Sequence, residues 1–150
     1  SGTDASYPLL KGDLQTETDG QYLLQFDFCL DSASSSDWYL ELRKSSSSDI
    51  SFQLLLGGTS LRSRNSGTIT TLASGLTQGI WHHVEMTLDS VNNRILSGSI
   101  TPYGSAPSTW GEVACPVIAT GIAQIVVRDN NSPAAAVMRL DNLSLDFFQE

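Results

Sequence analysis

The sequence has few charged residues, only two cysteines and no long hydrophobic run. Charged side chains make up 16% of its 150 residues and the mean hydropathy is -0.07, so we expect no membrane insertion. The formal net charge of -8 would repel a phosphate backbone, which argues against nucleic acid as a partner. Cys29 and Cys115 lack the short spacing of a zinc site or redox pair, and are either two buried thiols or one disulfide.

The amino terminus lacks the basic and apolar regions of a secretory signal peptide. The chain begins with Ser1-Gly2, which favours a domain taken from a longer protein that carries other domains. Its weakly charged composition, rich in serine, threonine, glycine and asparagine, is common in extracellular bacterial modules, and we expect an extracellular location. The length and the hydrophobic fraction of 40% fit a single domain that spans residues 1–150.

Apolar and polar residues alternate along most of the chain, which is typical of half-buried β-strands. Serine-rich loops separate the strands expected at 21–30, 38–44 and 50–56, and the tetrapeptide at 90–93 turns the strand at 80–89 into a hairpin. Further short strands are expected around 60–72, 115–119 and 123–129. No segment has a sustained helical period. The sequence therefore predicts an all-β protein, a two-sheet antiparallel β-sandwich of the jelly-roll type.

The alternation of apolar and polar residues shifts by one position within the last expected strand. Met138 and Leu140 share one parity, whereas the apolar residues between 143 and 147 share the other. A β-bulge near Asp141-Asn142 would return both sets to one face of the sheet.

Two segments carry a family resemblance. GIWHHVEMTLDSVNNRI, at 79–95, resembles the W-H-x-V strand and hairpin of laminin G-like and pentraxin-like domains, and MRLDNLSL, at 138–145, resembles the closing strand of concanavalin A-like jelly rolls. The resemblance implies the concanavalin A-like lectin/glucanase superfamily, in which the W-H pair supports packing. The strand after the hairpin lacks the Asp-Gly of laminin G-like domains, which favours a carbohydrate-binding relative.

That superfamily also contains glycoside hydrolases and polysaccharide lyases. Hydrolysis needs two carboxylates about 5 to 9.5 Å apart, and the E-x-D-x-E run that supplies them in related glucanases has no counterpart here. WYLELRK, at 38–44, resembles part of the R-x-E-L-R strand of some alginate lyases, but Tyr39 replaces the first arginine and the other lyase motifs are missing. We therefore expect no catalytic site. A small lyase or hydrolase remains an alternative.

The two adjacent histidines do not indicate a metal site. Neighbouring residues of a strand point to opposite faces, so His82 and His83 cannot both bind one ion. We expect one of them to be packed and the other exposed.

The polar parity of the strands provides a candidate sugar-binding surface. If the strands are neighbours, these side chains form one field on one sheet, and its arginines would suit carboxylate or sulfate groups. The candidate residues are Tyr39, Arg43, Gln53, Arg62, Arg64, His83 and Glu85. The alternative interpretation is a solvated face with local ion pairs to Glu41 and Glu85. Tyr103 and Trp110, in a loop rich in proline, glycine and serine, form a second candidate site unless one of them packs beneath the loop.

The resemblance also implies a structural calcium ion (Ca2+) where the first and last strands meet. Asp141 at the expected bulge corresponds to the ligand from the closing strand. Asp13 and Glu17 lie in the N-terminal segment that we expect to pair beside it. Such an ion would stabilise the fold without contacting sugar.

These observations predict a non-catalytic carbohydrate-binding module that recognises a polysaccharide or oligosaccharide and serves an extracellular polysaccharide-degrading enzyme. An acidic polysaccharide is favoured if the arginines cluster. A laminin G-like adhesion or protein-interaction module is the alternative, and an exposed apolar patch would favour it.

Overall fold

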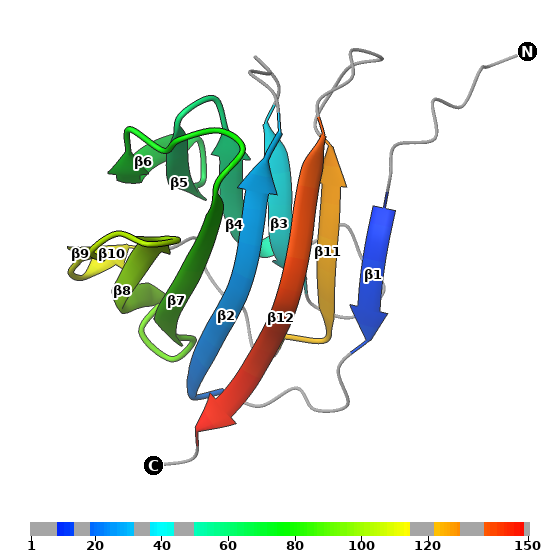
Figure 1. Ribbon diagram of the computed structural model, residues 1–150. Coiled ribbons are helices and arrows are strands. Elements are labelled where there is room, and N and C mark those ends of the chain that lie inside the picture. Colours follow the sequence, from blue (N-terminus) through cyan, green and yellow to red (C-terminus); the bar gives the residue numbers. More distant parts are fainter. Residues whose placement is uncertain are drawn as a thin grey trace, which may run out of the picture.

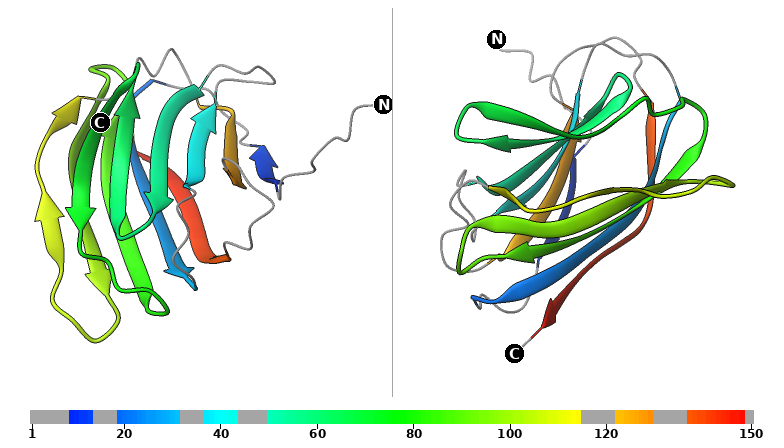
Figure 2. Two further views of the ribbon diagram at one scale, coloured as in Figure 1. Left: turned by 90° about the horizontal axis from the view of Figure 1, so that it is seen from above. Right: turned by 90° about the vertical axis from the view of Figure 1, so that its left-hand side faces the viewer.

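Two antiparallel sheets face each other in this computed structural model, which describes residues 9–13, 19–31, 37–43, 50–114, 122–129 and 137–148 (Figures 1 and 2). Sheet A has the strand order β1-β11-β3-β4-β5-β6, and sheet B has the order β10-β8-β7-β2-β12, with β9 also paired to β8. The strands are β1 (Leu9–Asp13), β2 (Gln21–Leu30), β3 (Trp38–Arg43), β4 (Ile50–Gly57), β5 (Ser60–Asn65), β6 (Thr68–Ser74), β7 (Trp81–Asp89), β8 (Arg94–Pro102), β9 (Ser108–Trp110), β10 (Val113–Ala114), β11 (Gln124–Asp129) and β12 (Met138–Phe148). The predicted antiparallel sandwich is confirmed.

The predicted apolar parity fills the space between the sheets. In β2 the residues from Tyr22 to Leu30 at every second position are buried, and Phe26, Phe28 and Phe52 are among the largest side chains with no contact with water. Each such side chain contributes about 1.5 to 3 kcal/mol to the free energy of unfolding. The predicted segment at 115–119 lies outside the described residues. Within the described part of the chain, no helix has the length and hydrophobicity needed to cross a bilayer.

The phase change in the last strand is the predicted β-bulge. Asp141 lies opposite Asp27 and Ser144 opposite Gln25, so Asn142 and Leu143 together face one residue of β2. Asn142 has a φ of 51°, a left-handed conformation that asparagine tolerates better than most residues. The bulge allows both apolar sets of β12 to pack on the core.

The two histidines of β7 lie on opposite faces, as predicted. His82 is 1% exposed and stacks on Phe28, with ring centroids 5.2 Å apart, and its burial lowers its pKa from the ordinary 6.5. His83 projects from the outer face of sheet B. Cys29 is a buried free thiol, whereas Cys115 lies outside the described residues.

The expected pairing of the N-terminal segment with the last strand is wrong for β1. This strand pairs with β11 in sheet A, with Asp13 opposite Gln124, whereas β12 pairs with β2 in sheet B. Alternation identifies a strand but not its neighbour, and β1 fills the edge that β11 leaves open. Asp13 and Asp141 therefore belong to different sheets.

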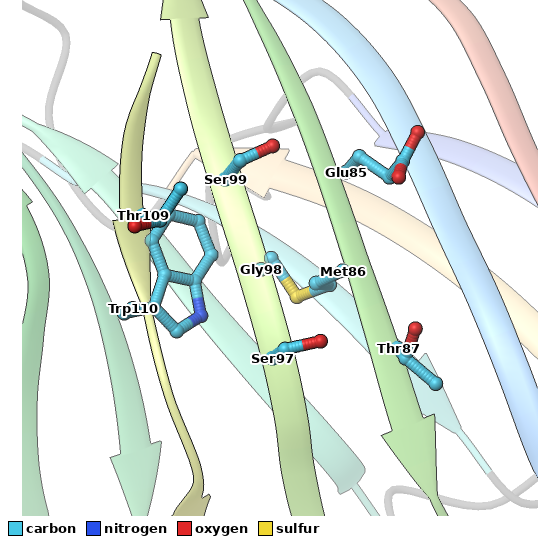
Figure 3. A pocket seen from close by; sticks show the side chains of 8 residues that line it. All are labelled: Glu85, Met86, Thr87, Ser97, Gly98, Ser99, Thr109 and Trp110. Atoms are coloured by element: carbon cyan, nitrogen blue, oxygen red, sulfur yellow. The ribbon is translucent and has the colours of Figure 1, made fainter.

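Trp110 does not project into solvent from a loop, because it belongs to β9 and packs against the edge of the core. Its indole ring occupies the space beside Gly98 of β8, where any larger residue would have its side chain (Figure 3). A Cβ atom at Gly98 would lie 2.4 Å from Cζ2 of the indole. Glycine at this position therefore lets the tryptophan close the edge of the sandwich.

We expect Gly98→Ala to lower the free energy of unfolding by about 1 to 3 kcal/mol, because the added methyl group must displace the indole. Gly111→Ala is the matched control, since a Cβ there meets nothing within 4 Å. Its effect should stay within about 0.5 kcal/mol. Urea denaturation followed by tryptophan fluorescence measures both. Equal effects of the two substitutions would contradict this packing.

Candidate functional site

The outer face of sheet A gathers arginines from three strands. Arg43 comes from β3, Arg62 and Arg64 from β5, and Arg128 from β11. The register aligns these strands so that Gln53 of β4 lies directly opposite Arg64. We call this surface the arginine face; its residues are Tyr39, Glu41, Arg43, Gln53, Arg62, Arg64 and Arg128.

Glu41 is the centre of the arginine face. Its side chain is fully buried, and Oε1 accepts hydrogen bonds from Nη2 of Arg128 at 2.7 Å and from Nε2 of Gln53 at 2.7 Å. Nε of Arg43 donates to Oε2 at 2.8 Å. Burial alone would raise the pKa of Glu41, but these hydrogen bonds outweigh it and hold the pKa below its ordinary value of 4.5. Glu41 is therefore an ionised carboxylate that holds two arginines in place.

Two further contacts order the face. The guanidinium group of Arg128 lies 4.4 Å from the centroid of the Tyr39 ring, so the tyrosine supports the arginine. Tyr39 is only 4% exposed, and its ring is not available as a stacking surface for a ligand. Arg62 forms an ion pair with Asp37.

Arg64 differs from these three arginines. Among the described residues it has no ion pair, and it lines an open pocket of about 580 Å³. Gln53 and Arg128 line the same pocket, together with Ile50 and the β5–β6 turn at 65–67. The pocket therefore offers one unpaired guanidinium beside an amide and a second, anchored guanidinium.

Among the described residues, the arginine face has the opposite charge from the chain as a whole. The sequence contains eight lysines and arginines against sixteen acidic residues, and four of the six basic side chains that the structure describes lie on this one face. The described carboxylates that pair with them are Glu41 and Asp37. This excess of positive charge suits an anionic ligand.

The predicted ligand residues thus fall into separate groups. Tyr39, Arg43, Gln53, Arg62 and Arg64 come together as predicted. The expectation that His83 and Glu85 share their sheet is wrong, because β7 pairs with β2 and β8 in sheet B. Arg128 was not among the predicted residues, and Glu41 was predicted only as a partner for local ion pairs. The parity of β11, where Arg128 alternates with buried Val127 and Ile125, was the signal that could have identified it.

On sheet B, Tyr103 and His83 line one pocket of about 370 Å³. Glu85 and Trp110 line another of about 270 Å³ (Figure 3), where Glu85 accepts a hydrogen bond from Nε2 of Gln25 at 2.9 Å. The two loop aromatics therefore do not form one site.

The described residues near Asp141 do not fit a calcium site. No group of three or more acidic, histidine or cysteine side chains in the described part of the chain could hold a metal ion. Oδ1 of Asp141 accepts a hydrogen bond from the backbone N–H of Asn142 at 2.8 Å. Glu17 lies outside the described residues, so the calcium ion stays a prediction of the resemblance.

No family model and no curated protein matches the chain. Solved structures do. An endo-β-1,4-glucuronan lyase from the fungus Trichoderma reesei matches with a TM-score of 0.60 and 16% identity, covering 95% of this chain and 74% of the lyase. A β-glucanase catalytic domain of glycoside hydrolase family 131 from Podospora anserina matches with a TM-score of 0.61 and 12% identity, covering 95% of this chain and 66% of that domain. Congerin II liganded with lactose matches with a TM-score of 0.53 and 14% identity, covering 93% of this chain and 100% of congerin II.

These likenesses establish the fold. The chain has the concanavalin A-like jelly-roll fold, as the sequence resemblance predicted. The fold is shared by catalytic domains and by a lactose-bound protein, and function must be argued from the residues of this chain.

We expect Glu41→Gln to lower the free energy of unfolding at pH 7 by about 3 kcal/mol, because it leaves two arginines without their buried partner. The loss should shrink toward pH 3. A carboxylate with a depressed pKa stabilises the fold above its ordinary pKa, and this stabilisation disappears as the pH falls through the lowered value. Urea denaturation at both pH values measures the effect.

Glu85→Gln is the control, an exposed carboxylate on the other sheet, and should change stability by about 0.5 kcal/mol or less. A loss for Glu41→Gln that is equal at both pH values would contradict the role assigned to its charge.

Proposed function

We propose that this chain is a non-catalytic carbohydrate-binding module whose arginine face binds an acidic polysaccharide. The observation that carries the proposal is Arg64, which has no ion pair among the described residues and lines an open pocket with Gln53 and the anchored Arg128. A uronate carboxylate or a sulfate ester accepts paired hydrogen bonds from a guanidinium group. The amide of Gln53 is buried and donates to Glu41, so it orders the face beneath the ligand.

Most side chains of the arginine face are already fixed, so binding a ligand there costs little conformational entropy. Glu41 fixes Arg43 and Arg128, and Asp37 pairs with Arg62, so most guanidinium groups are held before a ligand arrives. Preorganised groups lose little conformational freedom on binding. The open pocket takes its lining from β4, β5 and β11, and its width suits a chain of sugars.

A lyase is a weaker candidate for the same face. Removing a proton next to a uronate carboxylate requires a base that can reach it. The two titratable groups at the centre of the face are poorly suited, since Tyr39 is buried beneath Arg128 and the oxygens of Glu41 are buried and hydrogen-bonded to Arg43, Arg128 and Gln53. The arrangement therefore favours binding over catalysis.

The shared fold also supports a carbohydrate ligand, because structures with this fold include a glucuronan lyase, a β-glucanase and a lactose-bound protein. We infer on the same basis an extracellular location and a parent enzyme that degrades polysaccharides. The polar character of the arginine face argues against the alternative of an adhesion module that binds protein through an apolar sheet.

Affinity electrophoresis in gels of polyuronate, sulfated polysaccharide and neutral β-glucan tests the proposal. We expect retardation by at least one acidic polymer, weaker at high salt because exposed charge pairs are screened. Arg64→Gln should weaken this binding about ten-fold, which corresponds to one lost charge-assisted contact of about 1.4 kcal/mol.

Arg94→Gln is the matched control, because it removes the same charge from sheet B, where Arg94 pairs with Asp89 and Glu112. Its binding should equal that of the unaltered protein. An absence of retardation by every acidic polymer, or equal binding by Arg64→Gln, would refute the proposal. Release of unsaturated uronates or new reducing ends would show that the chain is an enzyme.

A further inference from the structure

A second group of polar residues crosses three strands on the outer face of sheet B. Asp27 of β2 lies directly opposite His83 of β7, and His83 lies directly opposite Thr101 of β8. The three residues line the pocket of about 370 Å³, which Trp81 and the turn at 102–104 complete. This pocket lies on the opposite side of the sandwich from the arginine face.

The orientation of His83 is fixed from one side. Its Nδ1 lies 2.6 Å from Oδ1 of Asp27, and Oδ2 of Asp27 accepts a hydrogen bond from Nδ2 of Asn142 at 2.5 Å. Asn142 is the left-handed residue of the β-bulge, so the break in β12 places this amide. Among the described residues, Nε2 of His83 has no partner. The imidazole is therefore ordered by Asp27, and His83 lines the pocket.

Tyr103 lines the same pocket from a hydrogen-bonded turn. Its backbone N–H donates to the carbonyl of Trp81 at 2.8 Å, and Ser105 N–H donates to Pro102 at 3.0 Å. Gly104, with a φ of 77°, supplies the left-handed residue that the turn requires. The tyrosine is nevertheless 85% exposed. A large aromatic ring held in water on an ordered backbone is available surface for a ligand.

Trp81 is not equally available. The guanidinium group of Arg139 lies 5.5 Å from the Trp81 ring, and Arg139 also pairs with Asp31. One face of the indole is therefore already covered by a side chain of β12. The exposed aromatic surface of the pocket is that of Tyr103.

We propose that this pocket is a second sugar site, in which the ring of Tyr103 covers the apolar face of a pyranose while His83 and Thr101 bind its hydroxyl groups. An aromatic ring pairs with the C–H face of a sugar, and ordered side-chain donors and acceptors select its hydroxyls. This site is independent of the arginine face and does not require the function proposed for it.

The charge around the pocket selects an uncharged sugar. The charged groups near His83 are Asp27, Glu85 on its own strand, Asp141 opposite Asp27, and Arg139 beside Trp81. Carboxylates therefore outnumber cations here, the reverse of the arginine face, and a uronate or sulfate would be repelled. Asp27 is the carboxylate among the described residues that line the pocket, and because its two oxygens already contact His83 and Asn142, an amino sugar would have to compete for them. The ligand class is a neutral hexose or pentose unit.

Titration with neutral gluco-, xylo-, manno- and galacto-oligosaccharides tests the site, with chemical shifts read by NMR and affinity by calorimetry. We expect at least one neutral oligosaccharide to shift the resonances of Tyr103 and His83. Tyr103→Ala should weaken its binding about ten-fold, and Tyr103→Phe, which retains the ring, should largely preserve it. Because Tyr103 is so exposed, its loss removes little packing, and unchanged stability will show that the variant is folded.

Two controls separate this site from the arginine face. Val91→Ala removes an exposed apolar side chain from another turn of sheet B and should not change the affinity. Arg64→Gln should leave neutral-sugar binding intact even where it weakens binding of an acidic polymer. The proposal is overturned if no neutral oligosaccharide shifts the two resonances, if Tyr103→Ala binds as tightly as the unaltered protein, or if Arg64→Gln removes neutral-sugar binding.

Discussion

A β-strand directs successive side chains to opposite sides, and the rest of this structure depends on that constraint. The residues that fill the core take every second position, so the remaining positions form the two outer faces. Where β12 would have turned its apolar residues outward, the bulge at Asn142 and Leu143 restores the phase. The same bulge places the amide of Asn142 on Asp27, so a correction needed for packing also orders a polar group on the surface.

Burial of one carboxylate explains the order of the arginine face. An ionised group without contact with water is costly unless its oxygens are fully hydrogen-bonded, and Glu41 meets this condition through Arg43, Arg128 and Gln53. Arg43 and Arg128 are both occupied by their ion pairs with Glu41. Arg64, one strand beyond Gln53, is left to face the pocket without an ion pair among the described residues. Among residues of the same type, two thus have a structural role, and Arg64 is the one to which our proposal assigns the ligand.

The two outer faces differ in charge, and this difference gives the protein two distinct surfaces. Sheet A carries an excess of arginine, whereas carboxylates predominate around His83 on sheet B. Because the faces lie on opposite sides of the sandwich, ligands of different character could occupy them together. In our interpretation the module would then connect an acidic chain to a neutral one.

Features that depend on neighbouring residues could be predicted from the order of amino acids. Alternation predicted the sandwich, the bulge near Asp141, the opposite faces of His82 and His83, and the common face of Arg62 and Arg64. Which strands are neighbours became known from the fold. It separated His83 from the arginines, moved β1 away from β12, brought Arg128 onto Glu41 and placed Trp110 on Gly98. The physical reason is that side-chain parity is local, whereas strand order is set by pairing between segments far apart in the chain.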